Sequence, residues 1–222
     1  MNTSEHKFNI SEIFFSIQGE GSRAGMPCVF IRLQGCNMRC SWCDTPYGLE
    51  AGQIENLMTA QEIITEVEKY NCNFIEFTGG EPLMQPEIVD VINYFCDNNF
   101  EVAIETNGYY SFDKISEKAI KIMDIKCPYS QMDKLNNYSN LTKLNKTDEV
   151  KFVIANENDF DWAIQTCDFY DLYNQVDTIL FSPVFNLMQP IDLANKILAS
   201  GRNIRMQLQL HKYIWDPNMR GV

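Results

Sequence analysis

The sequence predicts an α/β fold in which a mostly parallel sheet curves into a partial (β/α)6-type barrel. Stretches with strand character alternate with helical stretches at intervals of about 25–30 residues, which is typical of βαβ units. About six such units follow one another, fewer than the eight of a closed barrel. Cysteines, paired glycines and isolated charges come directly after the strand stretches, and parallel sheets build their sites at that edge.

Length and composition are those of one ordinary globular domain. The 222 residues suffice for one well-buried core but are few for two, so we expect a single domain over residues 1–222. No apolar run reaches the length of a membrane span, and the N-terminus lacks the pattern of a signal peptide, so we expect a cytoplasmic protein. The net charge of −12 is spread along the chain, which argues against direct nucleic-acid binding.

The first half of the chain carries local signals for each expected element. Thr59-Ala-Gln-Glu62 has the form of a capping box and starts a helix, and Pro86 suits the first turn of another helix. The strand at 10–17 runs into Gln18-Gly-Glu-Gly21, where the glycines allow a tight turn. The predicted strands are 10–17, 27–33, 74–78 and 101–105, and the predicted helices are 59–70 and 86–98.

The second half repeats the pattern with one polar interruption. Residues 131–147 are rich in Asn, Lys and Ser and predict a variable loop with at most a helical turn. Gly201 should end a helix, and Ile204–Leu210 alternates like a final strand before an extension over residues 211–222. The predicted strands are 119–125, 149–154, 178–181 and 204–210, and the predicted helices are 159–173 and 190–200.

Three cysteines form the most informative motif. Cys36, Cys40 and Cys43 have the spacing C-x-x-x-C-x-x-C, which fits one short loop over residues 36–43. Structural zinc normally takes four protein ligands, whereas a [4Fe–4S] cluster held by three cysteines leaves one iron open. The alternatives are a zinc site closed by another cysteine, or cysteines without a metal. The remaining cysteines stand among apolar neighbours and are expected in the core: Cys28, Cys72, Cys96, Cys127 and Cys167.

Arg32 interrupts the apolar run from Pro27 to Leu33. An arginine within such a strand is seldom left without a partner. It either reaches a local carboxylate or faces a site and binds an anion.

The cysteine motif with Trp42 before the last cysteine, followed by a strand ending in Gly79-Gly-Glu-Pro82, resembles the radical S-adenosylmethionine (SAM) superfamily. Within it, further motifs resemble the 7-carboxy-7-deazaguanine synthase family over residues 10 to 213. They are Ser16-Ile-Gln-Gly-Glu-Gly21, Phe30-Ile-Arg-Leu-Gln-Gly-Cys36, Cys43-Asp-Thr45, Glu105-Thr-Asn-Gly108 and Gln209-Leu-His-Lys-Tyr213.

The resemblance implies a lyase of queuosine and 7-deazapurine biosynthesis, which supplies a precursor for tRNA modification. It would contract the ring of 6-carboxy-5,6,7,8-tetrahydropterin to give 7-carboxy-7-deazaguanine and ammonia, after a 5′-deoxyadenosyl radical abstracts the C6 hydrogen. The implied cofactors are a [4Fe–4S] cluster, SAM and Mg²⁺. The implied partners are a flavodoxin- or ferredoxin-type electron donor and a second copy of the chain in a homodimer.

The resemblance also implies roles for single residues. Cys36, Cys40 and Cys43 would hold the cluster, and Thr45 would bind Mg²⁺. Arg32 and His211 would position the substrate, and the guanidinium of Arg32 suits its carboxylate. Residues implied to contact SAM are Trp42, Gly79, Gly80, Glu81, Glu105, Asp124, Ile125, Lys126, Ser182 and Pro183. Residues implied to hold the pterin are Ile17, Gln18, Gly19, Glu20, Arg32, Thr78 and His211.

The chain departs from the family pattern at three places. Relatives often carry S-P-K where this chain has Asp124-Ile-Lys126, and Q-P where it has Ser182-Pro183. Many relatives stop soon after H-K-x-x, whereas this chain continues to Val222, so we assign Val222 no substrate role.

Simpler readings compete with several of these roles. Gln18 and Glu20 could only fix a turn, Thr45 could cap local backbone, and His211 could be structural. Among functions, a glycyl-radical-enzyme activase would act on a protein partner, and the Gln18-Gly-Glu and Gln209-Leu-His-Lys motifs argue against it. A zinc-stabilised binding module without turnover is the alternative from another class.

Overall fold

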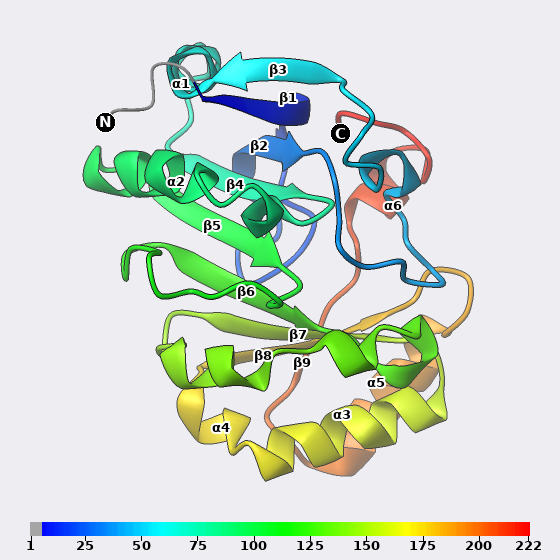
Figure 1. The fold of residues 1–222 in the computed structure, drawn as a ribbon. Coiled ribbons are helices and arrows are strands. Elements are labelled where there is room, and N and C mark those ends of the chain that lie inside the picture. Colours follow the sequence, from blue (N-terminus) through cyan, green and yellow to red (C-terminus); the bar gives the residue numbers. More distant parts are fainter. Residues whose placement is uncertain (1–5) are drawn as a thin grey trace.

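The frame of the molecule is one nine-stranded sheet, seen in a computed structural model that describes residues 6–222 (Figure 1). The strand order is β3-β1-β2-β4-β5-β6-β7-β8-β9. Strands β2 and β4 to β9 run parallel, and only β1 pairs antiparallel, with β2 and β3. The sheet is mostly parallel and does not close, which confirms the predicted fold class.

The strands are β1 Lys7–Ile17, β2 Pro27–Leu33, β3 Asn56–Thr59, β4 Phe74–Gly79, β5 Glu101–Thr106, β6 Ile120–Ile125, β7 Glu149–Ile154, β8 Thr178–Pro183 and β9 Arg205–Met206. The α-helices are α1 Ala60–Val67, α2 Ile88–Asp97, α3 Glu157–Phe169, α4 Leu172–Gln175, α5 Pro190–Ser200 and α6 His211–Ile214. The 3₁₀ helices are η1 Pro46–Gly48, η2 Pro82–Met84, η3 Pro128–Ser130, η4 Asp133–Leu135 and η5 Tyr138–Lys143. No helix among residues 6–222 has the length and apolar character needed to cross a membrane.

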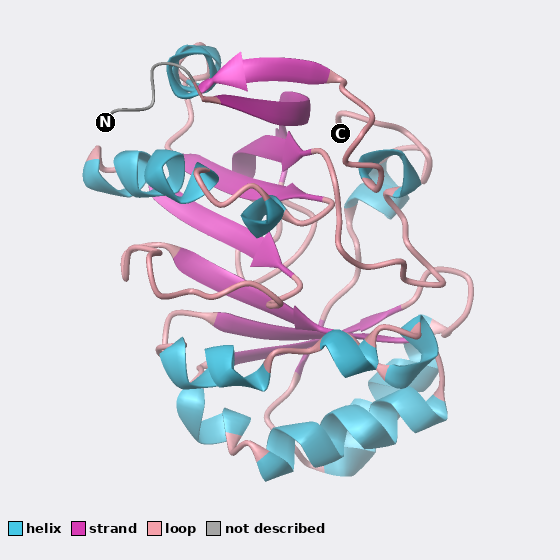
Figure 2. Ribbon diagram, viewed as in Figure 1, coloured by secondary structure: helices cyan, strands magenta, loops and turns pink. Residues whose placement is uncertain are grey.

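Helices α1 to α5 pack on the outer face of the sheet (Figure 2). A separate apolar cluster lies on the other face. Side chains such as Ile75 and Phe77 of β4 point into the main core with the apolar sides of α1 and α2. Their neighbours Phe74 and Glu76 are also buried, on the opposite, inner face, because successive strand residues alternate. Several strands are thus buried on both faces, as expected for a parallel sheet.

Two predicted elements differ most from the observed ones, and others differ at one end, since β1 begins at Lys7 and α1 ends at Val67. The helix expected at 159–173 is divided into α3 and α4, because Asp171 takes a left-handed conformation (φ +52°) between them. The strand expected at 204–210 pairs with β8 over two residues only. Beyond Met206 the chain leaves the sheet, and Gln207 and Gln209 donate hydrogen bonds to Glu20 across the barrel.

The crossovers on either side of β6 lack α-helices. Residues 107–119 connect β5 to β6 through turns, and the polar segment 131–147 contains η4 and η5. This polar segment is anchored by the fully buried Asn140, whose Nδ2 donates to the carbonyl oxygens of Gly108 (2.8 Å) and Tyr110 (2.6 Å). The helical layer is therefore thinner than a regular (β/α)6 arrangement would give.

Candidate active site

A cavity of about 880 Å³ opens at the C-terminal ends of the parallel strands. Residues after or at the ends of β2, β4, β5, β6 and β7 line it, as do the cysteine loop and the C-terminal segment. Its base is an apolar plug, defined here as the cluster of Phe14, Cys28, Phe30, Phe74, Ala103, Ile120 and Ile122. The rings of Phe14 and Phe30 stack within this plug at 4.9 Å between centroids. The sheet thus closes one end of the barrel with apolar side chains and leaves the other end for a site.

Cys36, Cys40 and Cys43 all line this cavity, and the other five cysteines do not. Ser41 ties their loop to η3, since its hydroxyl donates to the carbonyl oxygen of Tyr129 (2.8 Å). Burial raises the pKa of each of the three thiols, to about 11 for Cys40, so a bound metal must displace the protons.

The donor set fits an iron–sulfur cluster better than a single ion. Among residues 6–222, no three His, Cys, Asp or Glu side chains gather closely enough to hold one metal ion. Three free, half-buried thiols that nevertheless share one cavity suit a larger inorganic cluster with an open iron.

Gly79 and Gly80 cross the chain at Leu33–Gly35 in direct backbone contact. A Cβ on Gly80 would lie 2.2 Å from the carbonyl oxygen of Gly35, and one on Gly79 would lie 2.2 Å from that of Leu33. Gly79 also has a φ of +134°, which side chains rarely allow. The crossing places the glycine backbone against the cavity wall next to the cysteine loop.

Glu81 follows this crossing but does not line the cavity. Its carboxylate is fully buried and accepts hydrogen bonds from Thr106 Oγ1 (2.8 Å) and from the backbone amides of Asn107 (2.7 Å) and Leu83 (3.0 Å). The side chain therefore fastens the Gly79–Pro82 turn to the end of β5.

Among the residues expected at SAM, those lining the cavity are Trp42, Gly79, Gly80, Glu105, Asp124 and Lys126. Those outside its lining are Glu81, Ile125, Ser182 and Pro183. Three of the expected residues carry buried polar atoms without any hydrogen-bond partner: Trp42 Nε1, Asp124 Oδ1 and Ser182 Oγ. The second oxygen of Asp124 accepts from Lys126 Nζ (2.7 Å), whose ammonium lies 5.3 Å from the centre of the Trp42 ring. Two of these residues, Trp42 and Asp124, line the cavity, and their unpaired polar atoms fit a polar ligand such as SAM.

All seven residues expected at the pterin line the same cavity: Ile17, Gln18, Gly19, Glu20, Arg32, Thr78 and His211. Arg32 reaches a local carboxylate, because its Nε donates to Glu12 Oε1 (2.8 Å), and the residue also lines the cavity. Its binding of an anion stays a prediction. Burial lowers the pKa of His211, which favours the neutral imidazole.

The side chain of Gln18 is occupied within the protein. Its Oε1 accepts from the backbone amide of Glu20 (3.0 Å) and its Nε2 donates to Glu76. These contacts agree with the simpler interpretation, in which the side chain of Gln18 stabilises the turn after β1.

Thr45 lines the cavity directly after the cysteine loop. It stands at the N-cap of η1, but its hydroxyl makes no capping hydrogen bond and instead donates to Asp44 Oδ1 (3.2 Å). The side-chain capping role considered for Thr45 is therefore not seen.

Sequence reasoning missed two charged residues inside the barrel, Lys151 and Glu76. Lys151 Nζ lies 2.5 Å from Glu20 Oε2 and 2.6 Å from Glu105 Oε1. Burial alone would lower the pKa of Lys151, but Glu105 and Glu20 hold it well above its ordinary value. Both residues interrupt apolar strands, which is the signal that had drawn attention to Arg32.

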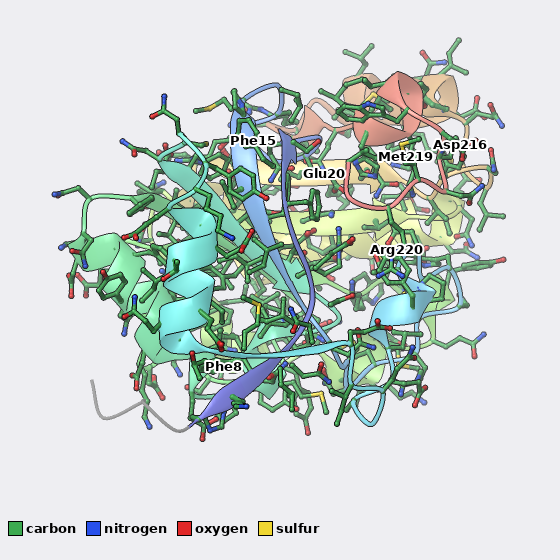
Figure 3. All side chains as sticks on the ribbon, turned by 90° about the horizontal axis from the view of Figure 1, so that it is seen from above. Phe8, Phe15, Glu20, Asp216, Met219 and Arg220 are labelled. Atoms are coloured by element: carbon green, nitrogen blue, oxygen red, sulfur yellow. The ribbon has the colours of Figure 1, made fainter. Side chains whose placement is uncertain are left out.

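The C-terminal segment also lines the cavity, including Val222, to which no role had been assigned. Asp216, Met219 and Arg220 lie along this segment in Figure 3. The guanidinium of Arg220 lies 3.8 Å from the centre of the Tyr47 ring and 3.9 Å from Glu12 Oε2. One carboxylate, that of Glu12, therefore contacts Arg32 and Arg220.

Comparisons with known proteins agree with this geometry. The model of the radical SAM superfamily matches residues 30–134. A 7-carboxy-7-deazaguanine synthase of Chlorobaculum tepidum is 41% identical, over 99% of this chain and 100% of its own length. Similar proteins of that name occur in Koribacter versatilis (38% identity; 96% of this chain, 99% of the relative) and Clostridium acetobutylicum (36%; 97% and 99%).

Solved structures show the same fold. The crystal structure of QueE from Escherichia coli superposes with a TM-score of 0.75 at 22% identity, covering 91% of this chain and 94% of that one. Streptococcus suis SuiB bound to S-adenosylmethionine gives a TM-score of 0.53 at 14% identity, over 79% of this chain and 45% of SuiB.

Proposed function

The chain belongs to the 7-carboxy-7-deazaguanine synthase family of radical SAM enzymes, and on that basis we propose that it contracts 6-carboxy-5,6,7,8-tetrahydropterin to 7-carboxy-7-deazaguanine with release of ammonia. Membership of this family implies a [4Fe–4S] cluster and SAM as cofactors. The observation that carries the proposal is that three free thiols and the expected pterin residues line one cavity.

Cys36, Cys40 and Cys43 would hold the cluster on the rim of the cavity. When bound, the cluster and SAM would together supply a carbon-centred radical able to remove the substrate's C6 hydrogen. The orphaned polar atoms of Trp42 and Asp124 are available to hydrogen-bond SAM.

The protein's part is to position the pterin and to keep water from the radical. Glu12 holds Nε of Arg32, so the terminal nitrogens of this guanidinium can bind the substrate carboxylate as a fork. The apolar plug seals the base of the cavity, and the segment from Pro217 to Val222 forms part of its wall.

Thr45 is our candidate Mg²⁺ ligand. Its hydroxyl has no capping role and lines the cavity two residues after Cys43. Mg²⁺ usually takes few protein ligands and keeps several waters, so one hydroxyl, substrate oxygens and water would complete its shell.

We also propose a homodimer and a flavodoxin- or ferredoxin-type electron donor. Support for both comes from the family resemblance. Sedimentation analysis would test the dimer, and reduction of the reconstituted protein by purified flavodoxin or ferredoxin would test the donor.

The test of function is anaerobic reconstitution with iron and sulfide, then incubation with SAM, dithionite and the carboxypterin. We expect methionine, 5′-deoxyadenosine and 7-carboxy-7-deazaguanine by mass spectrometry. Cleavage of SAM without conversion of the pterin would favour the activase, and a colourless protein that binds zinc would favour the binding module.

A further inference from the structure

Glu76 is a buried acid on the floor of the cavity. It stands in the middle of β4, where its register neighbours are Phe30 on β2 and Ala103 on β5, both members of the apolar plug. Its side chain faces inward, on the same side of the strand as Thr78. The residue is 3% exposed and lines the cavity, so its carboxyl lies where the apolar base meets the polar walls.

The protein satisfies only one oxygen of the Glu76 carboxyl. Among residues 6–222 its one hydrogen-bond donor is Gln18 Nε2, which contacts Oε2. Glu76 forms no ion pair with any of the described residues. The nearby ammonium of Lys151 pairs with Glu20 and Glu105 instead. Oε1 of Glu76 is therefore left without a protein donor, at a position that borders the cavity.

A ligand in the cavity can complete the hydrogen bonding of this carboxyl. A buried carboxyl loses its hydration and needs hydrogen bonds in return. Burial raises the pKa of Glu76 well above its ordinary value, and the neighbouring carboxylates of Glu105 and Glu20 raise it further. A ligand with an N–H group at Oε1 would supply the missing donor, and an oxygen accepts in either charge state.

Gln18 explains why Glu76 presents this acceptor. Both ends of the Gln18 amide are used, Oε1 by the backbone amide of Glu20 and Nε2 by Glu76. Gln18 thereby fixes the orientation of the carboxyl and keeps Oε2 occupied. Oε1 of Glu76 remains the acceptor offered to a ligand at this depth.

We propose that Glu76 is a specificity-determining residue that accepts a hydrogen bond from the 2-amino group of the substrate's pyrimidine ring. This inference rests on the proposed function, because it assumes a pterin in the cavity. Arg32 on β2 would hold the carboxylate of the same molecule, and Glu76 would hold the opposite, amino-bearing edge.

Two unreactive ligands test the contact without turnover. The first is 6-carboxypterin, which has the 2-amino group, and the second is 6-carboxylumazine, which has an oxygen in its place. Their dissociation constants would be measured by calorimetry on protein reconstituted with cluster and SAM, without reductant. In the unmodified protein we expect 6-carboxypterin to bind at least about tenfold more tightly than 6-carboxylumazine. The reason is that the lumazine oxygen would face Oε1 of Glu76, which is also an acceptor.

Substitutions at Glu76 should change this preference. In Glu76→Leu the acceptor is gone, so the two ligands should bind with similar constants. In Glu76→Gln the amide oxygen can still accept from Gln18, which leaves the NH₂ group facing the cavity and should shift the preference towards the lumazine. The matched control is Glu149→Gln, a buried acid of β7 that binds Ser22 and does not line the cavity, and it should keep the original preference.

The ligand preference of a variant is interpreted only if that variant binds SAM as tightly as the unmodified protein. If Glu76→Leu does not fold, the preference of Glu76→Gln alone tests the inference. Equal binding of the two ligands by the unmodified protein, or an unchanged preference in Glu76→Gln, overturns the inference. If the unmodified protein binds neither ligand, the proposed function fails, and this inference fails with it.

Discussion

At the scale of single residues, the barrel interior is recognisable by charges set in apolar strands. Arg32, Glu76 and Lys151 each interrupt such a strand, and all three line the cavity. A charge is tolerated at these positions because the inner face is occupied by other charged groups, such as Glu12 beside Arg32 and Glu105 beside Lys151. The sequence alone shows that a partner is needed, but it does not show which one.

The assignment of Cys36, Cys40 and Cys43 to the cluster predicts that substitutions at these cysteines and at core cysteines have different effects. Cys40→Ala should lose bound iron and sulfide and should no longer cleave SAM, because two thiolates remain for the cluster. Cys167→Ala, on the buried side of α3, should keep both. Iron and sulfide analysis after anaerobic reconstitution measures the difference, and full activity of Cys40→Ala would refute the assignment.

Arg32→Lys should weaken pterin binding while leaving SAM binding unchanged. The lysine keeps the charge but loses the guanidinium fork, and a charged contact of this kind is worth about 2–3 kcal/mol, or roughly thirty- to a hundredfold in affinity. Calorimetry with 6-carboxypterin gives the value. Unchanged affinity would restrict Arg32 to its structural contact with Glu12.

Thr45→Ala should lose the response of turnover to magnesium. If the hydroxyl binds Mg²⁺ together with substrate and water, added magnesium should raise the rate of the unmodified protein and not that of the variant. Both proteins should hold cluster and SAM equally well. An equal magnesium response in the two would place the metal away from Thr45.

At the scale of elements, the sequence predicted the central strands closely. Strand 27–33 and strand 149–154 have the expected bounds, and α1 begins at the predicted capping box of Thr59 and Glu62. These elements depend on local patterns of burial and capping, which one sequence displays.

The predictions were wrong where contacts between residues far apart in the sequence determine the structure. Residues 207–210 alternate like a strand, but Gln207 and Gln209 bind Glu20, nearly the whole chain length away. The break between α3 and α4 depends on a left-handed Asp171, which no periodicity indicates. The cavity contacts of residues 217–222 were missed for the same reason, since only the fold brings them beside Tyr47.

The C-terminal segment should contribute to substrate binding through Arg220. Arg220→Ala removes the contacts with Tyr47 and Glu12, each worth about 0.5–1 kcal/mol at a partly exposed site, so KM should rise about five- to thirtyfold with little change in kcat. Hydrogen exchange of residues 216–222 should become faster.

Arg202→Ala is the matched control, because Arg202 pairs with Asp168 and stacks over Tyr173 away from the cavity. An unaltered KM in Arg220→Ala would show that the segment holds its place without this arginine.

At the scale of the whole molecule, stability and function occupy different ends of one barrel. The apolar plug fills the end formed by the early parts of the strands, and the cavity occupies the other end. Phe74→Ala should therefore lower the free energy of unfolding by about 3–5 kcal/mol, as large-to-small changes in a core do. Leu198→Ala, 79% exposed on α5, should change it by no more than about 0.5 kcal/mol. Urea denaturation measures both, and similar values for the two would mean that the plug adds no stability.

The backbone crossing at Gly79 and Gly80 bears on how this protein can diverge. Every other amino acid places a carbon where the oxygens of Leu33 and Gly35 already stand, and neither backbone can move away without separating β2 from β4 at their C-terminal ends. Random mutation followed by selection would return glycine at both codons, whatever changes accumulate around them. These two positions therefore tolerate no residue other than glycine. Engineering of the cavity must keep both glycines.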